Sequence, residues 1–115
     1  METKNVAVVG HTHLRAMGLI ALIEQEKEIL NLIPETIGDT SHLESINFRI
    51  GQNGKEIRVF PEEKIDIFKK YKNLIVIDFI NEKNNIDFYE KNNIKKIIPC
   101  INAKIENILE LIILL

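Results

Sequence analysis

The stretch that most constrains the fold is residues 5–19, which joins an apolar strand, a short polar turn and an apolar helix. Residues 6–9 are an unbroken, β-branched-rich run, which is typical of a strand buried on both faces of a parallel sheet. Gly10 ends this run, and the pattern is helical from residue 14 to residue 25. Thr12 is predicted to cap the helix, because its hydroxyl can accept a hydrogen bond from a backbone N–H of the first turn.

Three further apolar runs predict three more strands, at residues 28–33, 73–79 and 94–101. Pro61 opens a helix between the second and third strands, and residues 81–93 form a short helix or loop. Asn102 is expected to cap a last helix over residues 103–115. Because strands alternate with helical segments, we expect an α/β fold in a single domain over residues 1–115. Its sheet is open and mostly parallel, with about four strands in the order 2-1-3-4.

A β-hairpin is expected within residues 47–60, before the third strand. The dipeptide at residues 53–54, Asn-Gly, is a strong signal for a type I′ turn, because both residues tolerate positive φ. Counting outward from this turn places Arg49 opposite Arg58. Like charges directly opposite each other are unfavourable. Either nearby glutamates neutralise these two arginines, or they bind an anionic ligand or partner.

Composition narrows the classes of protein that the chain can represent. The 115 residues are 45% apolar and 28% charged, as in an ordinary globular protein with its own core. The net charge of -2 gives no basic field, so we expect no nucleic-acid partner. Cys100 is the single cysteine, which excludes an internal disulfide and favours a reducing compartment. No apolar run approaches the ~20 residues that span a membrane, so we expect a cytoplasmic protein without membrane contact.

The carboxyl edge of the expected sheet is the place for a ligand site. In open parallel sheets, ligands bind beyond the carboxyl ends of the strands, where the strand order reverses. Here that point lies between the first and third strands. The candidate ligand-binding residues delivered to this edge are Gly10, His11, Thr12, His13, Asp78 and Cys100.

Several chemistries are open for this edge. A glycine before a helix N-terminus can cradle a phosphate, although neither G-x-G-x-x-G nor a P-loop motif is present. Zinc is a second interpretation, because His11, His13, Asp78 and Cys100 are all ligand types. The only candidate nucleophile–base pair is Cys100 with a nearby histidine. No complete catalytic motif is present, so we expect a non-enzymatic protein without a cofactor.

Residues 8–23 resemble the start of response-regulator receiver domains, with Gly18 and Leu19 in register with that family's Gly-Leu pair. Residues 74–79 look like the family's third strand, with Asp78 at the phospho-accepting position, and residues 94–101 look like its fourth. The resemblance implies a flavodoxin-like fold and a role in signal transduction. The family's Mg²⁺-binding acidic pair falls on Gly10 and His11, so charge on a transferring phosphoryl group would not be neutralised. We therefore expect a non-catalytic signalling or protein-interaction module.

A second resemblance is to the F-subunit family of archaeal/vacuolar-type rotary ATPases, whose members are also short α/β domains of four strands with a C-terminal helix, starting Val-x-Gly. It implies a structural component of a larger assembly. A small ligand- or metal-binding protein that uses the turn from Gly10 to His13 is a further alternative.

The last helix has more apolar residues than one face can bury. Exposed apolar patches often mark an interface. We therefore predict a homodimer or another protein partner through this helix, with Leu109, Ile112 and Ile113 at the contact. The alternative is that the end of the chain packs entirely into its own core.

Overall fold

Four parallel strands form the main sheet of the computed structural model, which describes residues 3–49, 54–80, 85–99 and 104–115. Their order is β2-β1-β6-β7, which confirms the predicted order 2-1-3-4. A second sheet, in the order β3-β5-β4, pairs β5 parallel to β3 and antiparallel to β4. The strands are β1 (Lys4–Val9), β2 (Leu30–Leu32), β3 (Glu35–Ile37), β4 (Ile46–Arg49), β5 (Glu56–Phe60), β6 (Ile75–Asp78) and β7 (Lys96–Pro99). The helices are α1 (Leu14–Gln25), the 3₁₀ helix η1 (Glu62–Lys70), α2 (Asn85–Lys91) and α3 (Ile105–Leu114).

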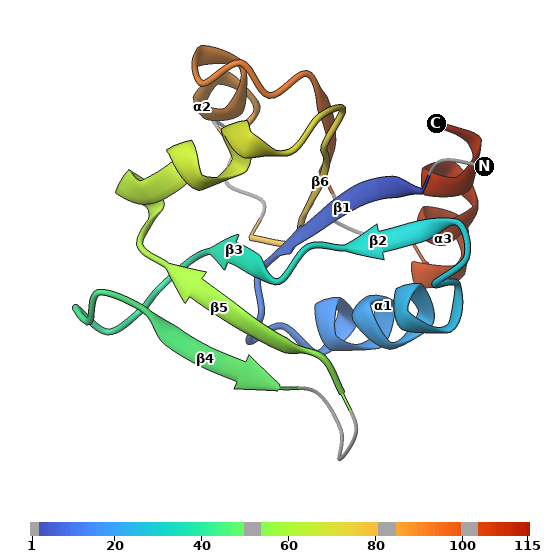
Figure 1. Cartoon of the computed structure of the whole chain (residues 1–115), viewed down its shortest axis with the longest axis horizontal. Helices are drawn as coiled ribbons and strands as arrows, with labels where there is room; N and C mark the ends of the chain where they lie inside the picture. The colour runs from blue at the N-terminus through green and yellow to red at the C-terminus, as the bar shows by residue number, and fades with distance from the viewer. Residues whose placement is uncertain (1–2, 50–53, 81–84, 100–103) are drawn as a thin grey trace.

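The main sheet is the middle of three layers. Figure 1 shows α1 and α3 on one face of it, with η1 and α2 on the other. Along β1, Val6 and Val8 enter the core beneath α1 and α3, whereas Ala7 and Val9 enter the core beneath η1 and α2. All four side chains are at most 2% exposed. The prediction that this strand is buried on both faces is therefore confirmed.

The turn after β1 sets where α1 begins. The backbone N–H of His13 donates to the Gly10 carbonyl at 2.8 Å, which places Thr12 inside a tight turn. His13 is therefore the N-cap, and its Nδ1 accepts from the Arg15 backbone N–H at 3.2 Å. The prediction that Thr12 caps this helix is wrong. The N-cap of α3 is Lys104, and the predicted cap Asn102 lies outside the described residues.

The register of the β4–β5 hairpin differs from the prediction by two residues. Arg49 lies opposite Glu56, with Nη2 and Oε2 3.1 Å apart, and Arg58 lies opposite Asn47 and donates from Nε to Ser45 Oγ at 3.0 Å. The prediction that Arg49 faces Arg58 is therefore wrong. A shift of two residues keeps the same side chains inward, so the apolar pattern could not distinguish these registers. The premise for an anion site at this arginine pair is lost.

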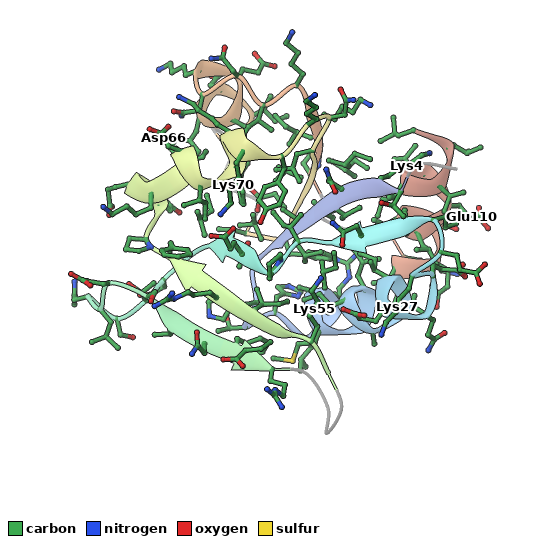
Figure 2. All side chains as sticks on the ribbon, in the orientation of Figure 1. Lys4, Lys27, Lys55, Asp66, Lys70 and Glu110 are labelled. Carbon is green, nitrogen blue, oxygen red and sulfur yellow. The ribbon has the colours of Figure 1, made fainter. Side chains whose placement is uncertain are left out.

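Polar side chains link the second sheet to η1 and to the residue that follows it. Glu35 Oε1 on β3 accepts from the Tyr71 hydroxyl at 2.6 Å and lies 2.5 Å from Lys70 Nζ; Figure 2 labels Lys70 at the end of η1. Burial would raise the pKa of Glu35, but hydrogen bonds from Lys70 and Tyr71 and the charges of Lys70 and Arg58 hold this pKa below its ordinary value. Pro61 precedes η1 as its N-cap instead of occupying its first position.

α3 packs its inward face against α1 and the main sheet. Ile108 and Ile112 are at most 2% exposed and belong to the same core as Val6 and Val8. The prediction that Ile112 contributes to an interface is wrong, because helical spacing turns it toward the sheet together with Ile108. Among the described residues, no helix is long and apolar enough to cross a membrane.

Candidate functional site

The turn that follows β1 lies directly against the end of β6, where the strand order reverses. Val9 pairs with Asp78, and the Phe79 backbone N–H donates to the Val9 carbonyl at 3.0 Å. Gly10 has φ of 107°, and a Cβ built on it would lie 3.0 Å from the Phe79 Cβ. Only glycine adopts this φ without strain, and the Cβ of any other residue would press on Phe79. Gly10 therefore closes the contact between β1 and β6.

Asp78, at the carboxyl end of β6, is bound inside the protein. Its side chain is 1% exposed; Oδ1 accepts from the Ile80 backbone N–H at 2.7 Å and Oδ2 from the Tyr89 hydroxyl at 2.9 Å. Tyr89 comes from α2 and is 2% exposed. Burial, together with the Asp78 charge, raises the pKa of Tyr89 far above its ordinary value. The tyrosine thus remains a hydrogen-bond donor, and both carboxylate oxygens have partners within the fold.

His11 turns away from Asp78 toward the second sheet. It is 4% exposed, its ring meets Phe48 of β4 edge-on with centroids 5.2 Å apart, and its Nδ1 lies against Gly38. Burial lowers the pKa of His11, which the charge of Asp39 only partly offsets. Within the described part of the chain, Nδ1 has no hydrogen-bond partner. His11 is a neutral, buried ring that joins the two sheets.

His13 and Arg15 lie on the side of α1, and both contact the Phe79 ring. The exposed His13 ring lies 5.7 Å from the Phe79 ring, centroid to centroid, and the Arg15 guanidinium carbon lies 5.7 Å from the same centroid. These contacts shield Phe79, which is 3% exposed. Thr12 is exposed at the tip of the turn.

The predicted site residues therefore reach the same edge but do not converge. His11 meets Phe48, His13 meets Phe79, and Asp78 meets Tyr89. No group of three or more His, Cys, Asp or Glu side chains could hold a metal ion within residues 3–49, 54–80, 85–99 and 104–115. Cys100 lies outside these residues.

The groove nearest to His11 is acidic and does not include the predicted phosphate cradle. It has a volume of about 460 Å³, includes Gly38, the neighbour of His11, and carries three carboxylates, those of Asp39, Glu62 and Glu63. Like charges would repel a nucleotide's phosphates in this groove. The turn from Gly10 to His13 does not line it, so the interpretation of Gly10 as a phosphate cradle stays a prediction.

The sequence patterns did not predict which residues contact Asp78 and His11. Tyr89 binds Asp78 and comes from the next element along the chain, whereas Phe48 contacts His11 and comes from β4, which is remote from His11 in sequence. The apolar pattern marked Phe48 as inward-facing, but nothing in it specified a histidine as its neighbour. A tyrosine in the helix after β6 was the one available signal for the Asp78 contact.

Comparison with known proteins gives no family assignment. No protein-family model matches the chain, and no curated protein matches its sequence. The function must therefore be argued from the geometry.

Gly10→Ala should destabilise the protein by about 1–3 kcal/mol, because alanine is strained at this φ and its methyl group would press on Phe79. Gly18→Ala is the matched control. It lies within α1, where alanine is favoured, and its methyl group would meet only the flexible end of Ile105 at 3.1 Å, so its change should stay within about 1 kcal/mol. Urea denaturation measures both. Equal losses for the two variants would contradict a special role for Gly10.

Stability should fall as the pH drops below about 6.5, the ordinary pKa of histidine. Below that pH the unfolded chain binds a proton at His11, while the folded chain resists it, so protons favour unfolding until the folded pKa is also passed. The contribution is fully present above pH 6.5. Denaturation curves at pH 7.5 and 5.5 should show a smaller pH effect for His11→Gln and His11→Leu than for the parent. The control variant His42→Gln, at an exposed position in the loop after β3, should keep the parent's effect, and a parent-like effect in both His11 variants would refute the assignment.

Proposed function

We propose that this chain is a non-catalytic, receiver-like interaction module with a flavodoxin-like arrangement. The observation that carries the proposal is the state of Asp78. This residue stands at the end of β6, the central strand beside β1, where the resemblance to receiver domains places the phospho-accepting aspartate. It is 1% exposed, and both of its oxygens accept hydrogen bonds from the protein.

Phosphoryl transfer to a carboxylate needs a free oxygen and a metal ion that neutralises the developing charge. Neither requirement is supported at this edge. The Tyr89 hydroxyl and the Ile80 N–H occupy the oxygens, and Gly10 and His11 stand where the acidic pair of a receiver would be. We therefore propose that the chain acts by binding a partner protein, with the parallel sheet as a rigid support.

The surface that supports partner binding is the outer side of α3. Its exposed apolar side chains, which we call the α3 patch, are Leu111 (45% exposed), Ile113 (37%), Leu114 (82%) and Leu115 (46%). Of the predicted contact residues, Ile113 belongs to this patch, whereas Leu109 is partly buried against the core. A cluster of this kind is typical of an interface.

Lys4 holds the α3 patch in place. Figure 1 shows the two chain ends at the same side of the molecule, and Figure 2 labels Lys4 there, at the start of β1. Its Nζ donates to the Ile113 carbonyl and, at 3.4 Å, to the Ile112 carbonyl. A cation at the C-terminal end of a helix also complements the helix dipole. The last turn is thereby ordered before a partner arrives, which reduces the entropic cost of binding.

We take a second copy of the chain as the partner. A two-fold contact uses the same patch on both copies, so one apolar surface is sufficient for a closed dimer. The patch residues are at least 37% exposed, whereas Ile108 and Ile112 of the same helix are buried in the core, so two copies can meet at the patch without disturbing either core.

Sedimentation velocity tests this interface. The parent should self-associate in a concentration-dependent manner, and Leu111→Glu/Leu114→Glu should be monomeric, because buried carboxylates in the contact are costly. Leu43→Glu is the matched control, since Leu43 is 58% exposed but lies in the loop after β3, and it should behave as the parent does. A parent that remains monomeric at high concentration, or a control that also dissociates, would contradict a dimer through α3.

A further inference from the structure

A second surface lies at the amino edge of the main sheet, where its strands begin. Two grooves adjoin there and share Asn73 and Lys96. The first, of about 570 Å³, is lined by Thr3, Lys4, Asn5, Lys72, Asn73, Ile75 and Lys96. The second, of about 360 Å³, extends along the segments that precede β6 and β7. Their sizes are those of small-molecule sites.

The chain builds this edge by using the same local structure twice. Asn73 and Asn93 adopt positive φ, 54° and 63°, in the short turns that follow η1 and α2. Asparagine tolerates this conformation better than most residues. The next residue in each case, Leu74 or Ile94, is buried at 7% exposure and leads into β6 or β7. Both turns therefore place their polar neighbours at one edge of the sheet.

These polar neighbours are mainly lysines. Lys72 and Lys95 are exposed and Lys96 is half-buried, and none of the three has an ion pair with a described residue. No aspartate or glutamate is among the described residues that line either groove. Two further lysines line the grooves: Lys4, which is held by the α3 carbonyls, and Lys69, which is paired with Asp66. Clustered like charges repel each other, and a bound anion relieves that repulsion.

The second groove also has an apolar floor beside the lysines, made by Phe68, Tyr71, Leu74 and Ile94. Tyr71 is fixed there, because its hydroxyl donates to Glu35 at 2.6 Å. Burial and this carboxylate raise the pKa of Tyr71 to about 12, so it stays neutral at physiological pH. A groove lined by lysines therefore continues into one that is partly lined by apolar side chains, among which Tyr71 is the most exposed.

We propose that this amino edge is a binding site for a nucleoside polyphosphate. The phosphates bind the ammonium groups of Lys72 and Lys96 in the first groove. The base packs on the apolar floor beside Tyr71 in the second. The net charge of the whole chain is -2, so the lysines form a local field instead of reflecting a generally basic surface. The carboxylates of Asp39, Glu62 and Glu63 line a separate groove, the one beside Gly38.

Isothermal titration calorimetry without divalent cations tests the proposal with three probes: ATP, inorganic tripolyphosphate and adenosine. ATP should bind the parent most tightly, because only ATP can fill both grooves. Lys72→Gln/Lys96→Gln should weaken ATP binding about tenfold or more, as expected for the loss of charged hydrogen bonds. The single variant Lys72→Gln, at an exposed position, should weaken it less and guards against a folding defect in the double variant.

Lys27→Gln/Lys64→Gln is the matched control, because it removes the same charge at exposed positions that line neither groove. Its affinity for ATP should stay within twofold of the parent's. The proposal is overturned if the parent binds no ATP, if tripolyphosphate binds as tightly as ATP, or if the control loses as much affinity as Lys72→Gln/Lys96→Gln. Binding of single-stranded oligonucleotides without binding of ATP would also overturn it and would identify a nucleic-acid surface.

Discussion

The pairing of β1 with β6 is the contact on which the rest of the structure depends. Both strands are buried on both faces, so each contributes side chains to the two cores that the main sheet separates. Their carboxyl ends are joined by further contacts: Gly10 lies against Phe79, and Asp78 is bound by Tyr89. The strand order reverses at this pair, which is where an α/β sheet usually offers a ligand site.

In this chain, side chains at the carboxyl ends of β1 and β6 make contacts within the protein. Asp78 is bound by α2, and the buried His11 ring connects the turn after β1 to β4. A charged group removed from water needs partners, and here the fold itself supplies them for the carboxylate. The two surfaces that we propose for binding lie elsewhere: the α3 patch is apolar, and the amino edge is rich in lysine. A partner and a ligand could thus bind without disturbing either core.

The sequence was sufficient for the order of the main strands but not for the directions of the side chains at their ends. Unbroken apolar runs indicate buried parallel strands, and the crossover rule then limits their order. The register of the hairpin was not predictable from periodicity. Whether Arg49 pairs with Arg58 or with Glu56, the same side chains of both strands face inward. His11 comes just after β1, and Asp78 ends the neighbouring strand β6. Their side chains face different elements, because His11 packs against Phe48 and Asp78 binds Tyr89.

The fold holds Asp78 at both carboxylate oxygens, and we propose that this residue does not accept a phosphoryl group. The most direct test incubates the protein with acetyl phosphate and Mg²⁺ and then measures the intact mass. We expect no phosphoryl adduct in the parent, because Tyr89 and the Ile80 N–H hold both carboxylate oxygens in a buried site. A Mg²⁺-dependent adduct that is present in the parent and absent in Asp78→Asn would contradict it.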